Sequence, residues 1–157
     1  MTSPDVGRYE QHTAPAGTDP ELVRTAAGLV DMMLSAWSEP EQERRRAVLD
    51  SCCVPEVSYV NLLAEATGTA AVAELLGRLT AQFPGVRPVR SSALDFHHRY
   101  ARFEWVIQNE AGQPLLQGLD VIVLSEEHDR TASVITFFGA VNRTATYTYG
   151  VPAYGAP

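Results

Sequence analysis

The chain has 157 residues, of which 45% are hydrophobic and 20% charged, and its formal net charge at pH 7 is −7. This length and composition predict one globular domain with a substantial core. The acidic balance argues against binding to nucleic acid or to anionic lipid, because both need a positively charged surface. We therefore expect neither a nucleic-acid partner nor a membrane partner.

Location and metal binding can be considered from the start of the chain and from its cysteines. No apolar run approaches the length of a membrane span, and the N-terminus lacks the charged start and apolar core of a secretion signal. The only cysteines, Cys52 and Cys53, are adjacent, which offers neither a disulfide framework nor the spacing of a metal site. We expect a cytoplasmic protein without a metal site.

The first half of the chain predicts a leader and three helices. Residues 1–18 are rich in Thr, Ser, Pro and Gly without periodicity, which is typical of a disordered leader. Helices are expected from about residue 20, from about residue 41 to residue 53, and from residue 69 to residue 83. The first should begin with a capping box between Thr18 and Glu21. The arginines of the second are expected to form a solvated face.

The second half changes to strands, over roughly 88–98, 100–109, 114–124 and 131–141, and a short strand is expected over 57–61. Helices followed by a run of hairpins predict an α+β domain. We expect a cone-shaped, curved antiparallel sheet with the three helices packed on its concave face. The domain should span 19–141, followed by a tail over 142–157 that contains Tyr, Gly and Pro.

One residue breaks the pattern of the third long strand. Residues 118–124 are apolar on both faces except at Asp120. Burying an ionised carboxylate is costly, so such a group is normally paired, hydrogen-bonded or protonated. The four-residue turn before this strand predicts that Asp120 lies opposite Phe103, and Trp105 opposite Gly118. Directly opposed residues share a face, so Asp120 is expected on the aromatic face of the sheet.

Three stretches of the chain carry a family pattern: 59–61 followed by a helix start at 68–72, then 97–105, and then 118–120 followed after a turn by 134–139. In order and content they resemble the nuclear transport factor 2-like superfamily. That superfamily includes ketosteroid isomerases, SnoaL-type polyketide cyclases and limonene-epoxide hydrolases. The resemblance covers about residues 20–141 and implies a ligand-holding cone, but the fold carries many functions.

Carried over by position, Asp120 looks like the carboxylic acid with which ketosteroid isomerases donate to a developing oxyanion. The general base of those isomerases falls at about Asn61, which cannot act as a base, and no Tyr stands at their oxyanion position near Asp31. The acid that the epoxide hydrolases carry on the last long strand is missing from 135–138. The resemblance therefore implies neither a plain steroid isomerase nor that type of hydrolase.

Our leading hypothesis is a small, cofactor-independent enzyme that isomerises or cyclises an apolar, polyketide- or terpenoid-like molecule. It would use acid–base chemistry in an apolar cavity, with Asp120 as acid or base and a raised pKa. His97 and His98 point to opposite faces of a strand, so one of them, assigned as His97, is expected to be catalytic. The expected substrate-binding residues are Tyr59, Asn61, Phe103, Trp105 and Phe138.

Two alternatives stand beside this hypothesis. Asp120 would be a structural acid if Tyr59 or backbone groups satisfied it, since buried polar groups are normally hydrogen-bonded. The chain would then be a non-catalytic domain that binds a small molecule or serves as a scaffold. In either case the sheet face that carries Arg102 and Glu104 must be covered or solvated. We expect a homodimer formed through that convex face.

Overall fold

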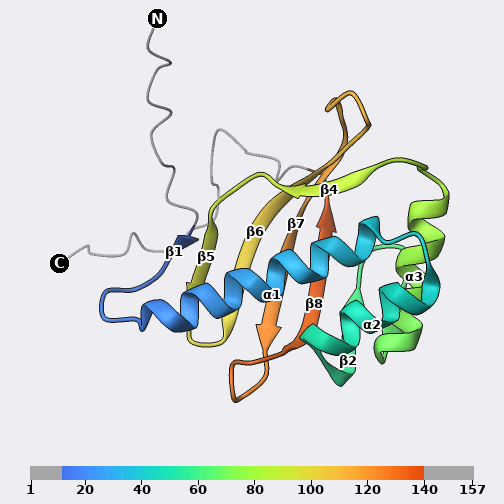
Figure 1. Ribbon diagram of the computed structural model, residues 1–157. Helices are drawn as coiled ribbons and strands as arrows, with labels where there is room; N and C mark the ends of the chain where they lie inside the picture. Colours follow the sequence, from blue (N-terminus) through green and yellow to red (C-terminus); the bar gives the residue numbers. More distant parts are fainter. Residues whose placement is uncertain (1–11, 140–157) are drawn as a thin grey trace, which may run out of the picture.

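The computed structural model describes residues 12–139 (Figure 1). The helices are α1 (Pro20–Ser38), α2 (Gln42–Cys52) and α3 (Thr69–Ala81). The strands are β1 (His12–Thr13), β2 (Cys53–Val60), β3 (Glu65–Thr67), β4 (Arg87–Arg90), β5 (Leu94–His97), β6 (Tyr100–Gln108), β7 (Pro114–Leu124) and β8 (Thr131–Phe138). The predicted tail over 142–157 lies outside the described residues.

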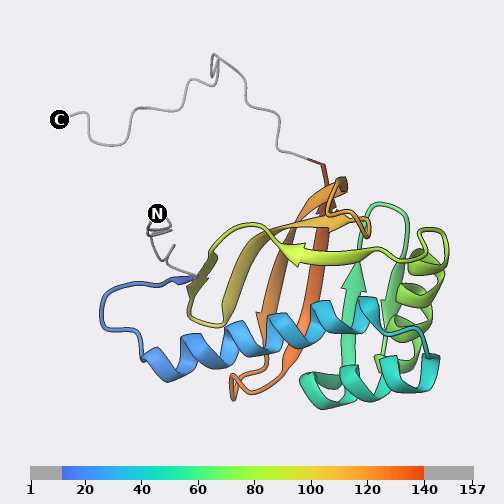
Figure 2. The same cartoon turned by 45° about the horizontal axis from the view of Figure 1, so that its top comes forward.

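The strands form one curved sheet in the order β1-β5-β6-β7-β8-β2-β3, with β4 beside β5 on the same edge of β6. Helix α1 runs across one face of this sheet, and α2 and α3 lie toward its β2–β3 end (Figures 1 and 2). The α+β class and the helix-covered curved sheet are thus confirmed. The long hairpins are antiparallel, whereas β2 pairs with β8, and β1 with β5, in parallel.

Helix α1 begins at a different cap from the predicted one. The Asp19 carboxylate accepts a hydrogen bond from the Glu21 N–H at 2.9 Å, and Pro20 occupies the first turn. The Thr18 hydroxyl instead donates to the Pro15 carbonyl. The buried face of α1 consists of residues at helical spacing, namely Val23, Ala26, Leu29, Val30, Met33 and Ala36. This stripe packs on the sheet and supplies one side of the core.

The arginines of α2 do not all lie on a solvated face, which corrects that prediction. Arg44 and Arg46 are exposed, but Arg45 is only 4% exposed. Its guanidinium donates to the carbonyls of Glu39 and Ala36 at the end of α1 and to the carbonyl of Ala73 in α3. A buried cation needs such acceptors, and here they tie the three helices together.

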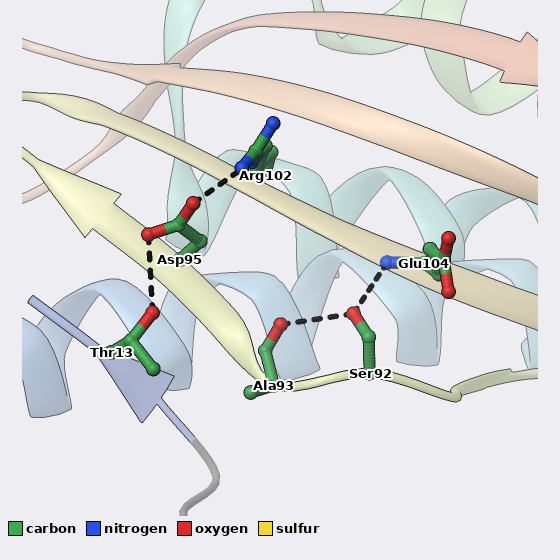
Figure 3. A network of polar contacts seen from close by, with 6 residues as sticks. All are labelled: Thr13, Ser92, Ala93, Asp95, Arg102 and Glu104. Atoms are coloured by element: carbon green, nitrogen blue, oxygen red, sulfur yellow. Dashed lines mark hydrogen bonds and ion pairs between the residues drawn. The ribbon is translucent and has the colours of Figure 1, made fainter. Parts of the chain in front are cut away.

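The predicted strand over 88–98 is interrupted at 91–93, which separates β4 from β5. The Ser92 hydroxyl accepts a hydrogen bond from the Glu104 N–H at 2.7 Å and donates to the Ala93 carbonyl (Figure 3). A side chain thus replaces one backbone bond of the ladder where the strand bends. The hydroxyl of Thr13 in β1 donates to Asp95, which also accepts from Arg102. The part of the leader at 12–13 is therefore paired with the sheet, contrary to the prediction.

The register between β6 and β7 around Asp120 is the predicted one. Asp120 lies opposite Phe103, and Trp105 lies opposite Gly118. Alternation along β6 turns Phe103 and Trp105 toward the helices and Arg102 toward the convex face. Asp120, opposite Phe103 on β7, therefore also points toward the helices. Gly118 is required at this pairing: a Cβ there would overlap the Trp105 ring and lie 2.6 Å from the Phe137 carbonyl oxygen.

Candidate active site

The site is built around the carboxylate of Asp120, in the middle of β7 and only 7% exposed. Trp105 reaches it from β6, and its indole Nε1 donates to Asp120 Oδ1 at 2.9 Å. Thr136 reaches it from β8, where it lies directly opposite Asp120, and its hydroxyl donates to the same oxygen at 2.7 Å. Three neighbouring strands thus fix one oxygen of a single carboxylate.

The second oxygen of Asp120 is left for another partner. Within residues 12–139, Oδ2 accepts no hydrogen bond, although Asp120 lines a small cavity beside it. A proton bound to the carboxyl therefore belongs on Oδ2, because Oδ1 already accepts two hydrogen bonds. This arrangement presents one oxygen to a ligand and holds the other in place.

Tyr59, in β2, is linked to this carboxylate through Thr136. The Thr136 hydroxyl lies 3.2 Å from the Tyr59 hydroxyl. Because Thr136 has one proton and gives it to Asp120, Tyr59 must be the donor in this second bond. Burial raises the pKa of Tyr59 to about 12, so its hydroxyl stays protonated at neutral pH. The result is a directional chain from Tyr59 through Thr136 to Asp120.

Asn61 follows the end of β2 and is buried. Its Oδ1 accepts hydrogen bonds from the N–H groups of Leu63 and Ala64, which fixes the orientation of the amide. Its Nδ2 has no hydrogen-bond partner within the described part of the chain. The amide nevertheless lies near enough to the Tyr59 phenol to lower its pKa slightly. Asn61 therefore carries a spare donor near the Tyr59 hydroxyl, but it does not line the cavity beside Asp120.

The environment of Asp120 changes its acidity. Burial raises the pKa of Asp120 from 3.8 to about 6, and the hydrogen bonds from Thr136 and Trp105 offset part of that effect. Among the described residues no cationic side chain lines the cavity, whose walls are Leu34, Trp37, Tyr59, Pro88, Trp105, Ile107 and Asp120. An acid with this pKa exists in both protonation states near neutral pH, as acid–base chemistry requires.

Two cavities meet at this site. The first, which we call the Asp120 chamber, has a volume of about 10 Å³, or room for about one water molecule. The second, which we call the apolar cleft, has a volume of about 330 Å³ and opens to solvent between the β2–β3 connection, the end of α3, the start of β7 and the end of β8. Its rim carries Leu62 and Leu63, which are 85% and 74% exposed. Trp37, Pro88 and Ile107 line both cavities.

The other predicted ligand contacts are distributed between core and cleft. Phe103 is buried on the same face as Asp120 but does not line the chamber. Phe138 lines the apolar cleft and meets the Trp105 ring edge to face, with centroids 6.1 Å apart. Trp105 therefore joins the two regions, since one of its edges binds Asp120 and its ring packs on the wall of the cleft.

The structure does not bring His97 to Asp120. In the pairing of β5 with β6, Phe96 and Ala101 share the buried face, whereas His97 lies opposite Tyr100 and is exposed. The Nδ1 atoms of His97 and His98 are 3.1 Å apart, and neither residue lines the Asp120 chamber. This placement corrects the expectation that one of these histidines faces the cavity. β5 turns His97 to the convex side, and His98 lies after the end of β5, in a turn where its φ is 53°.

Thr136 and Gly118 were not among the predicted site residues. Thr136 supplies the shorter hydrogen bond to Asp120, and Gly118 provides the space that the Trp105 ring occupies. A signal for Gly118 is present in the sequence, because a glycine opposite a tryptophan on neighbouring strands indicates close packing of the ring on the backbone.

Two further observations limit the chemistry and setting of the described residues. Within residues 12–139, no group of three His, Cys, Asp or Glu side chains is arranged to hold a metal ion. No helix in the same range is both long and apolar enough to cross a membrane.

Comparison of the sequence with models of protein families gives no match, and neither does comparison with curated proteins. Comparison with solved structures does. The chain is similar to a "putative isomerase of the SnoaL-like family" from Agrobacterium tumefaciens str. C58, at 27% identity and a TM-score of 0.69, over 74% of this chain and 99% of that one.

Two more distant structures share the architecture. An NTF2-like protein of unknown function from Mesorhizobium loti is 16% identical, with a TM-score of 0.57 over 82% of this chain and 99% of that one. A "putative polyketide cyclase" from Xanthomonas campestris pv. campestris is 17% identical, with a TM-score of 0.54 over 75% of this chain and 93% of that one. The chain has the fold of the nuclear transport factor 2-like superfamily.

Proposed function

We propose that this chain is a small enzyme that isomerises or cyclises an uncharged, apolar molecule by acid–base chemistry at Asp120. The observation that carries the proposal is the carboxylate itself. It is buried among apolar and aromatic side chains, its pKa is raised to about 6, and Oδ2 is free beside a cavity. Burying such a group costs stability, and functional sites commonly carry that cost.

The geometry supports different roles for the two oxygens of Asp120. In the protonated form, Oδ2 would donate its proton to a substrate carbonyl or hydroxyl oxygen. In the ionised form, it would take a proton from the substrate. The hydrogen bonds of Trp105 and Thr136 to Oδ1 stabilise the negative charge in either direction. The apolar cleft would hold the rest of the molecule, because no charged side chain lines it within the described residues.

The similar structures support the same class of reaction. One is named as an isomerase of the SnoaL-like family and another as a polyketide cyclase, both with the qualification quoted above. These names describe those proteins. They bear on this chain only through the shared fold.

A second candidate function is a non-catalytic domain that binds a small molecule. Two observations favour it: the chamber holds only about one water molecule, and among the described residues Asp120 is the only acid that lines it. In that case Asp120 would be a structural acceptor for Trp105 and Thr136. Removal of its charge would then cost stability instead of activity.

The deciding experiment compares the wild type with Asp120→Asn. The carboxyl of Asp120 is titrated by NMR, and the free energy of unfolding of both proteins is measured at pH 7. For a functional acid we expect a pKa near 6 and a variant at least as stable as the wild type, with any turnover lower by ~10²-fold or more. A pKa at or below ~3.9 together with a variant destabilised by ~1–3 kcal/mol would leave only the binding domain.

We also infer that the chain forms a homodimer through the convex face of the sheet. That face carries Phe137, which is exposed, together with the partly exposed Leu119, Val121 and Ile135. Apolar side chains gathered on one sheet face are typical of a protein interface. Sedimentation at micromolar concentration should show about twice the chain mass of 17.1 kDa, and a monomer alone would contradict the inference.

A further inference from the structure

The two tryptophans of the chain are held in different ways. Trp105 donates its indole N–H to Asp120 and packs its ring against the backbone at Gly118. Trp37 has no hydrogen bond to its indole within residues 12–139, and its one ring contact is edge-on to Tyr59, with centroids 6.5 Å apart. It is half-buried, near the C-terminal end of α1. Trp105 is therefore fixed, whereas packing alone positions Trp37.

Trp37 also lies where a movement would matter. Of the three side chains that line both the Asp120 chamber and the apolar cleft, Pro88 belongs to β4 and Ile107 to β6, so the sheet holds their positions. Only Trp37 comes from a helix end. The same side chain also lines a third, open hollow between the ends of α1 and α3, with a volume of about 440 Å³. There is room on that side for the ring to turn into.

The sizes of the cavities show why such a movement is needed. The chamber as it stands admits about one water molecule, and an organic substrate requires ~300 Å³ or more. The apolar cleft has that volume, about 330 Å³, but Asp120 does not line it. A molecule that fills the cleft reaches Asp120 Oδ2 only if the wall between the cavities opens.

We propose that the Asp120 chamber and the apolar cleft are two halves of one binding site, and that Trp37 is the movable wall that controls access to Asp120. The inference rests on the proposed function, because it assumes that a ligand meets Asp120. The ligand is an uncharged, apolar molecule with one oxygen function at its inner end. The apolar part lies in the cleft, and the oxygen meets Asp120 Oδ2.

The test uses acetophenone, which has one carbonyl oxygen, and ethylbenzene, which has a similar shape without it. Binding to the full chain at pH 5 is followed by stopped-flow tryptophan fluorescence over increasing concentrations of each compound. In the wild type the observed rate should level off, because turning of Trp37 limits access. In Trp37→Ala the rate should rise in proportion to concentration, reaching ~10-fold or more above the wild-type plateau.

Two further variants keep the test interpretable. Trp37→Phe leaves a smaller ring in place and should give an intermediate plateau, even if Trp37→Ala folds poorly. Tyr100→Ala is the matched control, because Tyr100 is an exposed aromatic side chain that lines none of these three cavities. It should keep the wild-type plateau. Equal rates in the wild type and both Trp37 variants would overturn the proposal.

NMR titration of Asp120 separates this proposal from the proposed function. A bound ketone accepts the proton of Oδ2, so saturating acetophenone should raise the pKa of Asp120, whereas ethylbenzene should not raise it by this route. If access depends on Trp37 but the pKa does not move, Trp37 controls entry to the cleft without the ligand meeting Asp120, which overturns the proposed function and the role of Trp37 as a gate to Asp120. If the pKa rises with unchanged kinetics in every variant, the function stands and the gate fails. No saturable binding to any variant would overturn both.

Discussion

The Asp120 chamber and the apolar cleft share a wall but are built in contrasting ways. The chamber lies between α1 and the sheet, and hydrogen bonds of 2.7 Å from Thr136 in β8 and 2.9 Å from Trp105 in β6 hold its acid. The cleft lies at element ends and loops, and its rim carries leucines exposed to solvent. The contrast indicates that the fold fixes the reacting group rigidly on strands, while loops and helix ends provide the space for a ligand.

The largest effect on stability is expected from Gly118→Ala, which changes the packing around the rigid Asp120 chamber. A Cβ there would overlap the Trp105 ring and crowd the Phe137 carbonyl, so the ring must leave Asp120. We expect the free energy of unfolding to fall by about 3 kcal/mol. Chemical denaturation measures it. Gly28→Ala is the control, since Gly28 is exposed in α1 with open space around it, and it should be neutral or stabilising. Equal effects of the two changes would contradict the close packing at Gly118.

The pH dependence of stability tests the buried acid. Between pH 3.8 and about 6, the folded chain keeps a proton on Asp120 that the unfolded chain releases. Stability from this group is therefore fully present below that window and is lost as pH rises through it, by about 3 kcal/mol in total. Urea unfolding at several pH values should show this fall in the wild type and not in Asp120→Asn. Parallel profiles would mean that Asp120 titrates as an ordinary surface acid.

A smaller effect is expected at Thr136, which links the chamber to Tyr59. Thr136→Val removes the shorter hydrogen bond to Asp120 and the acceptor of the Tyr59 hydroxyl. The pKa of Asp120 should rise above that of the wild type, and the free energy of unfolding should fall by about 1–2 kcal/mol. Thr136→Ser keeps the hydroxyl and should resemble the wild type in both. An unchanged pKa in the valine variant, measured by NMR, would show that this bond does not tune the acid.

The smallest effect on stability is expected at the rim of the cleft. Leu62 and Leu63 are so exposed that replacing both with serine should change the free energy of unfolding by less than about 0.5 kcal/mol. Binding of acetophenone should nevertheless weaken several-fold, because apolar surface is removed from the cleft. Calorimetric binding and thermal unfolding of the same sample give both results. A large loss of stability would show that the rim belongs to the core after all.

Sequence reasoning reached Asp120 and its surroundings because the β6–β7 hairpin could be paired by counting. That counting is right at Phe103 and Trp105, although the turn itself pairs Gln108 with Pro114 and a bulge then restores the register. The same method would have failed in the β7–β8 hairpin. Counting inward from the pair Leu124 and Thr131 would place Ile135 opposite Asp120.

A bulge between Leu124 and Val123 shifts the pairing of β7 with β8 by one residue, so that Thr136 instead lies opposite Asp120. Nothing local in the sequence marks such a bulge. Arg45 was missed for a different reason. Besides the Gln42 side chain in its own helix, its acceptors are backbone carbonyls from α1, α3 and the connection after α1, and such non-local groups leave no pattern in the helix that carries the arginine. His97 was misassigned, although the buried Leu94 and Phe96 alternate with Asp95 and so place His97 on the opposite face.

The short strands at the margins of the sheet have a consequence for aggregation. Along the edges of the described sheet, β1 has two residues, β3 has three and β4 has four, and β4 contains Pro88, which has no N–H to offer. Fibril growth needs a long, unpaired edge on which a strand from another molecule can add. This sheet exposes little of that kind, so at high concentration the folded protein should form discrete assemblies through its faces and resist ordered fibres.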